Sequence, residues 1–297
     1  MMRAMRQARS VRRAFSWCGV LLSLGACHVH PPRDGAVKIE NEGASLAGAV
    51  WYPGVGQPPF PAVVLVHGSG RVTRDDMITA RTRFLSMGVA VLAYDKRGVG
   101  ESTGEYDAVG VPTSEVRMPL LGRDALAALR VLKKLRGIDP SRLGFFGISQ
   151  GGWIVPSALG DASPAEVRFA VIRSGPAGSV GQEMVYSEAT GDGIRPHENL
   201  TPAQIDARVD AYTGKAGFDN LPALRKTRVP ILWLIGEADE SIPVRHTIRN
   251  LQSLAAAGVP ITLHTYPGAD HGLFTASGPA PFWEDVYAWL RNQQLLR

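Results

Sequence analysis

Short, wholly apolar runs alternate with stretches of helical periodicity along most of this chain. Ala62–Val66 reads AVVLV, and Val89–Tyr94, Phe169–Arg173 and Ile231–Ile235 are similarly apolar. Runs of this length without polar alternation are typical of strands that are buried on both faces of a sheet. Between them lie amphipathic segments such as Leu120–Leu135, which has the 3.6-residue repeat of a helix. The alternation therefore predicts an α/β fold, with a mostly parallel central sheet and helices on both faces.

Further expected elements complete the pattern. Before the first buried run we expect a hairpin, and after it more helices and two more strands. The hairpin comprises Val37–Glu40 and Leu46–Trp51. The further helices are expected over Asp75–Met87, Gly151 to about Leu159, Val244–Ala257 and Pro281–Leu296, and the further strands over Arg142–Gly147 and Ile261–Tyr266. Because ligands of such sheets bind at the carboxyl ends of the strands, catalytic side chains should directly follow strands.

One long segment interrupts the alternation. Residues 176–226 separate two predicted strands and exceed a normal connection in length, with several glycines and a helical pattern over Pro202–Tyr212. Such a segment forms either a small helical cap over the site or a surface excursion without a role in binding. We expect the cap.

The charge of the chain is concentrated at its N-terminus. Five arginines lie within the first 13 residues, and without them 27 basic side chains balance 27 acidic ones. Ala14–Ala26 is apolar but too short to span a membrane as a helix, so residues 1–26 have the pattern of a cleaved signal peptide. We therefore expect a tether over 27–35, a catalytic domain over 36–297, and no nucleic-acid partner.

The end of this leader resembles the lipobox of bacterial lipoproteins. Its residues are Leu24-Gly25-Ala26-Cys27, and the resemblance implies that Cys27 is lipidated after cleavage. It implies a location in the cell envelope, on the outer membrane facing the periplasm, with the lipid as the only membrane contact. The alternative is an ordinary signal peptide and a soluble secreted or periplasmic protein. Arg12-Arg13 leaves export by a twin-arginine route open.

A candidate nucleophile follows the strand Arg142–Gly147. Gly147-Ile148-Ser149-Gln150-Gly151 fits Gly-x-Ser-x-Gly between a strand and a helix. A serine on so sharp a turn has a strained backbone, and glycines on either side avoid collisions. The turn would present the Ser149 hydroxyl above the sheet edge, at the positive end of a helix dipole.

A serine needs a base, and the base needs an orienting acceptor. Among the seven histidines, His271 lies in a loop directly after the last expected strand. Asp239 follows the strand Ile231–Ile235, and the order Ser149, Asp239, His271 suits the Ser…Asp…His order of one hydrolase fold. Glu237, Glu240 and Asp270 are the alternatives for the acid.

A tetrahedral oxyanion needs fixed backbone N–H donors. We expect one from Gln150, directly after the nucleophile, and one from His67-Gly68-Ser69-Gly70, with Ser69 as first choice and Gly70 as second. His67 would brace this loop. The chain has neither a zinc-type Cys/His cluster nor a phosphate-binding Gly-Lys loop, so we expect no metal and no organic cofactor.

Taken together, these motifs resemble the α/β-hydrolase superfamily from about residue 36 onward. His67–Gly70 resembles its oxyanion loop, and Tyr94–Ser102 (YDKRGVGES) its loop after the fourth strand. Within the superfamily the chain is similar to the esterase, dienelactone-hydrolase and prolyl-oligopeptidase-like branch. The resemblance implies an α/β-hydrolase fold and a Ser-His-Asp mechanism.

These features predict hydrolysis of a small-molecule carboxylic ester through an acyl-serine intermediate. A peptidase, an amidase or a thioesterase with the same triad is the alternative within the enzymes. A lipoprotein that retains the fold as a non-catalytic binding module is the alternative of another class.

Overall fold

A computed structural model describes residues 34–194 and 199–296. The predicted signal peptide, Cys27, the tether up to residue 33 and His197 lie outside the described residues. In the described part of the chain, no helix combines the length and the apolar composition that crossing a membrane requires.

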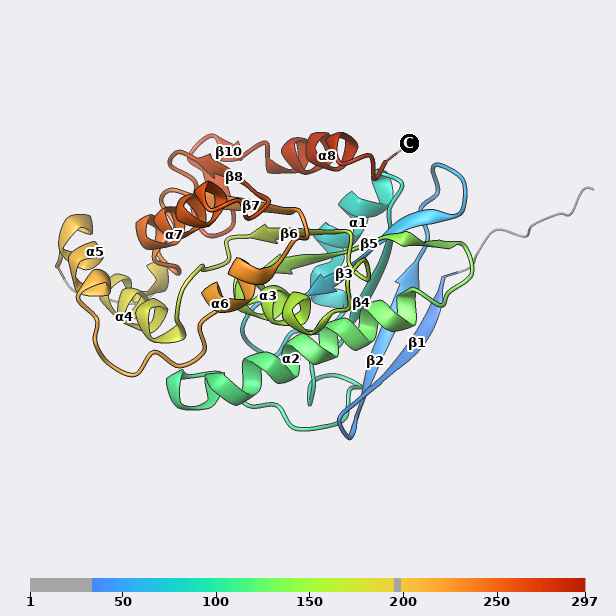
Figure 1. Cartoon of the computed structure of the whole chain (residues 1–297), viewed down its shortest axis with the longest axis horizontal. Helices are drawn as coiled ribbons and strands as arrows, with labels where there is room; N and C mark the ends of the chain where they lie inside the picture. Colours follow the sequence, from blue (N-terminus) through green and yellow to red (C-terminus); the bar gives the residue numbers. More distant parts are fainter. Residues whose placement is uncertain (1–33, 195–198, 297) are drawn as a thin grey trace, which may run out of the picture. The chain divides into compact units, whose positions relative to one another are not determined.

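The centre of the fold is an eight-stranded sheet with the order β1-β2-β4-β3-β5-β6-β7-β8 (Figure 1). The β1–β2 and β2–β4 pairs are antiparallel, and every later pair in this order is parallel. The strands are β1 Gly35–Asn41, β2 Ala44–Trp51, β3 Phe60–Val66, β4 Ala90–Tyr94, β5 Ile138–Ile148, β6 Phe169–Arg173, β7 Ile231–Gly236 and β8 Ile261–Tyr266. The predicted mostly parallel α/β architecture is therefore confirmed.

Helices cover both faces of the sheet. The helices outside residues 176–226 are α1 Ile78–Ser86, α2 Val111–Leu132, α3 Gly151–Asp161, α7 Val244–Ala256 and α8 Phe282–Asn292. A 3₁₀ turn, η1 Asp75–Met77, directly precedes α1. Helices α2 and α3 lie on one side of the sheet, and α8 lies on the other (Figure 1). The predicted helices are thus present, with ends shifted by a few residues except at α2.

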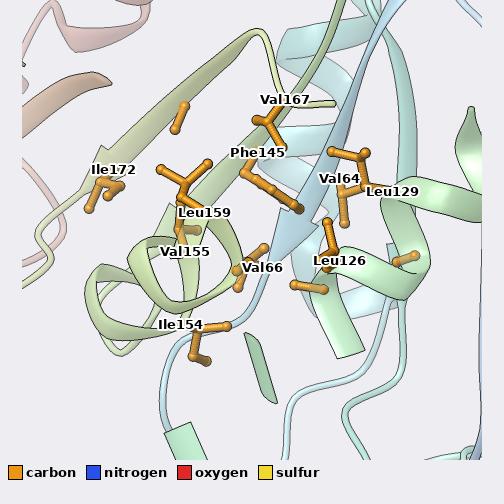
Figure 2. Close-up of a cluster of buried hydrophobic side chains, with 14 of the residues drawn as sticks. Val64, Val66, Leu126, Leu129, Phe145, Ile154, Val155, Leu159, Val167 and Ile172 are labelled. Atoms are coloured by element: carbon orange, nitrogen blue, oxygen red, sulfur yellow. The ribbon is translucent and has the colours of Figure 1, made fainter. Parts of the chain in front are cut away.

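The alternation of side chains along β3 explains why all of its residues are apolar. Val64 and Val66 belong to a core cluster with the buried faces of α2 and α3, whereas Val63 and Leu65 belong to a second cluster with α1 and α8. Figure 2 shows the first cluster, in which the labelled α2 and α3 side chains are Leu126, Leu129, Ile154, Val155 and Leu159. Both faces of the strand exclude water, so a polar residue on either face would be costly.

Helix α2 begins nine residues before the expected start at Leu120. Pro112 stands in its first turn, where a missing N–H costs nothing, but Pro119 lies inside the helix. The early turns are held by tertiary contacts: Ser114 and Met118 are buried, and Ser114 Oγ accepts a hydrogen bond from Phe218 N (2.9 Å). Packing therefore outweighs the local penalty of the proline.

Residues 176–226 contain more helix than the sequence predicted. They form α4 Val180–Thr190, the 3₁₀ turn η2 Gly191–Gly193, α5 Pro202–Asp210 and α6 Leu221–Lys226. Helix α4 has a capping box between Ser179 and Gln182 and ends at Gly191, whose φ of 66° is left-handed. Helix α6 packs against α3, whereas α4 packs against α5 and reaches α2.

Candidate active site

Ser149 lies on a sharp turn between β5 and α3. Its φ is 53°, in the left-handed region that side chains rarely adopt, and its N–H donates to the carbonyl of Arg173 at 2.9 Å. Glycine is required nearby for space: a Cβ at Gly147 would lie 2.9 Å from Val155 Cγ2, and one at Gly152 would lie 2.7 Å from Gly175 Cα. The expected strained serine turn is therefore present, although the tightest packing is at Gly152 rather than Gly151.

His271 and Asp239 meet at the carboxyl ends of β8 and β7. The distance from His271 Nδ1 to Asp239 Oδ2 is 2.7 Å, and the Asp239 side chain is 0% exposed, against 31% for His271. The other oxygen of Asp239 accepts bonds from the backbone N–H groups of Ser241 (2.8 Å) and Ile242 (3.3 Å). The carboxylate is thereby held in place and leaves the second ring nitrogen of His271 available.

Asp270, one of the alternatives for the acid, has different partners. Its Oδ1 accepts bonds from Gly272 N (2.8 Å) and Phe274 N (2.9 Å), so it shapes the loop that carries His271. Glu240 is tied to the neighbouring helix through its carbonyl, which accepts from Thr190 Oγ1. Within the described residues, Asp239 is the carboxylate bonded to the His271 imidazole.

The loop after β3 lies beside Ser149. A Cβ added at Gly68 would lie 3.4 Å from Ser149 Cβ, so this backbone passes close to the serine. The buried ammonium of Lys96 donates to the carbonyls of Gly68 (2.7 Å) and Gly70 (3.3 Å), and to Gln150 Oε1 at 2.8 Å. Lys96 therefore joins the two segments in which the oxyanion donors were predicted.

Ser149 and His271 line one cavity of about 630 Å³, a size typical of small-molecule sites. Ser69, Ser149, Gln150 and His271 line it from the sheet side. The segment after β6 supplies much of the remaining lining, including the α4 residues Val180, Glu183, Met184 and Ser187 and, beyond that helix, Asp192 and Ile194. Residues 176–226 thus contribute directly to the cavity that contains the serine and the histidine.

Two titratable groups near the serine have altered acidity. Burial lowers the pKa of Lys96 to about 8. Burial also raises the pKa of Glu183 to about 8, with smaller contributions from the carboxylates of Asp192 and Asp239. Perturbed groups of this kind are characteristic of functional sites.

Sequence reasoning assigned no role to either residue. The tripeptide Asp95-Lys96-Arg97, directly after a buried strand, was the available signal for Lys96. For Glu183 the signal was the capping-box pair Ser179 and Gln182, which announces α4 and places Glu183 in its first turn.

His67 is buried inside the loop that it was expected to brace. Its Nε2 lies within hydrogen-bond distance of the carbonyl of Tyr94, and its ring meets the Tyr94 ring edge-on with centroids 4.5 Å apart. Burial and the positive charge of Lys96 lower its pKa to about 4, so the ring is neutral at pH 7. No group of three or more His, Cys, Asp or Glu side chains in the described ranges could hold a metal ion.

Residues 77–295 match the family model of the prolyl oligopeptidase family. The human acylamino-acid-releasing enzyme is 24% identical over 274 residues, which cover 89% of this chain and 36% of that protein. Esterase EstD of Thermotoga maritima is 36% identical over 118 residues, covering 37% of this chain and 26% of that protein. Thiohydrolase aneE of Aspergillus aculeatus is 32% identical over 111 residues, covering 37% of this chain and 32% of that protein. The chain thus spans about a third of the length of the acylamino-acid-releasing enzyme and of Thiohydrolase aneE.

Solved structures share the same fold. The Pyrococcus furiosus esterase Pf2001 superposes with a TM-score of 0.61 and 21% identity, covering 88% of this chain and 93% of that one. Porphyromonas gingivalis dipeptidyl peptidase 4 gives a TM-score of 0.65 at 18% identity, covering 88% of this chain but 35% of that one. The expected α/β-hydrolase fold is confirmed, and with the match over residues 77–295 the chain belongs to the prolyl oligopeptidase family.

Proposed function

We propose that this protein is a serine hydrolase that cleaves small-molecule carboxylic esters through an acyl-serine intermediate. One observation carries the proposal: Ser149, held at a φ of 53°, lines the same cavity as His271, whose Nδ1 is bonded to the buried carboxylate of Asp239. A serine, an imidazole and a buried acid in this relation are the parts needed to make an alcohol nucleophilic.

The reaction proceeds in two halves. Ser149 Oγ attacks the acyl carbonyl while His271 Nε2 takes its proton, and Asp239 stabilises the imidazolium through Nδ1. The tetrahedral intermediate collapses when the alcohol leaves with that proton, which forms the acyl-serine. Water then attacks the acyl group while His271 takes its proton. As the acyl–oxygen bond breaks, His271 returns that proton to Ser149 Oγ, so the carboxylic acid is released and the free serine is regenerated.

The oxyanion is bound by the N–H groups of Gln150 and Ser69 in this proposal. Lys96 supports the choice of Ser69 over Gly70, because it holds the carbonyl of Gly68. In a trans peptide the C=O and the following N–H point in opposite directions, so the N–H of Ser69 points away from the ammonium group. Ser69 also lines the cavity, whereas Gly70 does not.

A fluorophosphonate probe tests the nucleophile. The parent protein should label with one equivalent, and Ser149→Ala should not label and should lose about 10⁴-fold or more in ester turnover. Asp239→Asn should keep the labelling site but react far more slowly, because the imidazole is then held in the wrong tautomer. Labelling of Ser149→Ala to the same extent as the parent would contradict Ser149 as the nucleophile, and failure of both proteins to label would favour a non-catalytic binding module.

A substrate panel tests the preference for esters. p-Nitrophenyl acyl esters, the matching thioesters and aminoacyl-p-nitroanilides present the same carbonyl with different leaving groups. We expect the ester to have the highest kcat/KM, because amide hydrolysis also needs efficient protonation of a poor leaving group. A higher kcat/KM for the anilide would make the protein a peptidase, and a higher value for the thioester would make it a thioesterase.

The location remains a separate proposal: lipidation of Cys27 anchors the catalytic domain to the outer membrane, facing the periplasm. It is supported by the sequence Leu24-Gly25-Ala26-Cys27. Metabolic labelling with a fatty-acid analogue should mark the parent protein but not Cys27→Ala. A labelled Cys27→Ala would contradict Cys27 as the lipidated residue, and an unlabelled, soluble parent protein would support secretion without an anchor.

A further inference from the structure

Arg173, the last residue of β6, lies close to the catalytic serine through its backbone but not through its side chain. Its carbonyl accepts the hydrogen bond from Ser149 N at 2.9 Å. Its guanidinium carbon lies 5.9 Å from the ring centre of Phe282, the first residue of α8. The charge is therefore on the α1–α8 side of the sheet, where the mechanism proposed above does not use it.

The guanidinium of Arg173 is without an anionic partner. It forms no hydrogen bond and no ion pair with any residue in 34–194 or 199–296, and its Nε is both buried and unpaired. Asp239 and Asp270 act on it only through space, because their carboxylates are bonded to the His271 imidazole and to backbone N–H groups. Partial burial lowers the pKa of Arg173, and the more distant carboxylates of Asp239 and Asp270 only partly oppose this effect.

The space next to this charge is a cavity of about 370 Å³. Its walls are mainly apolar and include Phe146, Phe282 and Trp283, with the Phe146 and Trp283 rings stacked 5.5 Å apart. Phe274 stands at its edge with 54% of its surface exposed, an unusual position for a phenylalanine. The cavity shares no lining residue with the one that contains Ser149, although its Gly272 directly follows His271.

We propose that this second cavity binds a monocarboxylate with a compact apolar body, with Arg173 pairing with the carboxylate and the aromatic walls enclosing the body. A planar guanidinium matches a carboxylate with two parallel hydrogen bonds. The Nε of Arg173 is buried without a partner although the residue as a whole is only partly buried, and an anionic ligand would supply the missing acceptor. A phosphate ester fits less well: the other cation of the cavity, Arg83, is exposed, and the exposed carboxylate of Asp76 also lies at the cavity.

Phenylacetate is the probe that tests this site, and phenylacetamide is its uncharged counterpart. Isothermal titration of the full-length parent protein should show one phenylacetate site, with phenylacetamide at least about tenfold weaker. Arg173→Met, which keeps the length but removes the charge, should lose phenylacetate binding. Arg225→Met, at an exposed position of α6, should retain it.

Because phenylacetate also resembles a product of ester hydrolysis, the catalytic cavity must be separated from this one. His271→Ala should bind phenylacetate like the parent, and Ala80→Phe, which fills the second cavity from α1, should not. Thermal unfolding adds an independent measurement: phenylacetate should raise the Tm of the parent but not that of Arg173→Met. Binding that survives in Arg173→Met and Ala80→Phe but disappears in His271→Ala would overturn the proposal, and so would no binding at all. Neither result depends on whether Ser149 is catalytic.

Discussion

The ammonium group of Lys96 lies between the loop after β3 and the residue that follows the nucleophile. It contacts two backbone carbonyls and the side chain of Gln150, and only 3% of the residue is exposed. A single charge thus sets the relative position of Ser69 and Gln150, the two proposed donors to the oxyanion. In the proposed reaction Lys96 would be a positioning residue, because it would act through the peptide groups that it holds.

Lys96→Met should lower kcat about 10- to 100-fold with little change in KM, because misplaced donors weaken binding of the transition state more than of the substrate. The exposed Lys134→Met is the control and should leave both constants unchanged. Since the pKa of Lys96 is about 8, the parent should lose kcat as the pH rises through 8, and this limb should be absent in Lys96→Met. Parallel pH profiles of the two proteins would contradict this role.

The lowered pKa of His67 should make the free energy of unfolding depend on pH. Its pKa is about 4 in the folded protein and about 6.5 in an unfolded chain, so the unfolded state binds more protons between these values. The free energy of unfolding should therefore fall as the pH drops from 6.5 to 4, by up to about 3 kcal/mol. Urea unfolding at several pH values should show this slope in the parent and in His264→Gln, but a shallower one in His67→Gln. The slope is the readout, since His67→Gln also loses packing.

Helix α4 connects the cavity that contains Ser149 to the loop that carries Asp239. Glu183 and Met184 line the cavity, whereas Tyr186 OH donates to the carbonyl of Asp239 at 2.8 Å. Thr190 Oγ1 donates to the carbonyl of Glu240, one residue later. Movement of this helix would therefore displace both the cavity wall and the backbone of Asp239.

Tyr186→Phe should remove the support that α4 gives to the backbone of Asp239 while leaving the cavity wall in place. The loss of one partly buried hydrogen bond should cost about 0.5–1.5 kcal/mol in the free energy of unfolding. It should also lower kcat/KM several-fold, and more for long acyl chains that reach the wall formed by the helix. Tyr212→Phe is a matched control, because its hydroxyl donates to Lys215 O (2.9 Å) in the same segment without touching the acid loop. Equal kinetic effects of the two variants would contradict the connection.

At the scale of the whole described fold, a buried ion pair joins parts of the chain that are distant in sequence. Arg97, after β4, donates through Nε to Asp124 Oδ2 on α2 at 2.9 Å. Asn41, at the end of β1, donates to Asp124 Oδ1 at 2.8 Å, and its carbonyl accepts from Arg97 Nη2 at 3.0 Å. The antiparallel hairpin, the loop after β4 and α2 are thus held at one point with almost no access to water.

Asp124→Leu should destabilise the protein by about 3–5 kcal/mol, because it leaves the Arg97 charge buried without its partner. The double variant Arg97→Met/Asp124→Leu should recover much of this loss. The fourth protein is a control variant in which the exposed pair between Arg123 and Glu42 is broken, and its free energy of unfolding should be only about 0–1 kcal/mol below that of the parent. Chemical denaturation of the four proteins measures these differences, and equal costs for the buried and the exposed pair would refute the role of Asp124.

Local sequence patterns were sufficient to predict most strands of the sheet and the positions of the candidate catalytic residues. Buried strands such as Ala62–Val66 are recognisable because both faces exclude water, so every position is apolar. Ser149 and His271 follow such strands, and parallel strands bring their carboxyl ends to one edge. The location of both residues could therefore be predicted without coordinates.

Packing between distant segments decided where α2 begins, where α4 lies and which charged side chains are buried. The early turns of α2 run through Pro119 because residues near Phe218 hold them. The capping box of α4 is a local signal, but only the tertiary structure shows that this helix lines the cavity. Lys96, Glu183 and Arg173 look like ordinary charged residues in the sequence. Their acidity and their partners depend on which groups surround them after folding, and no local pattern encodes that environment.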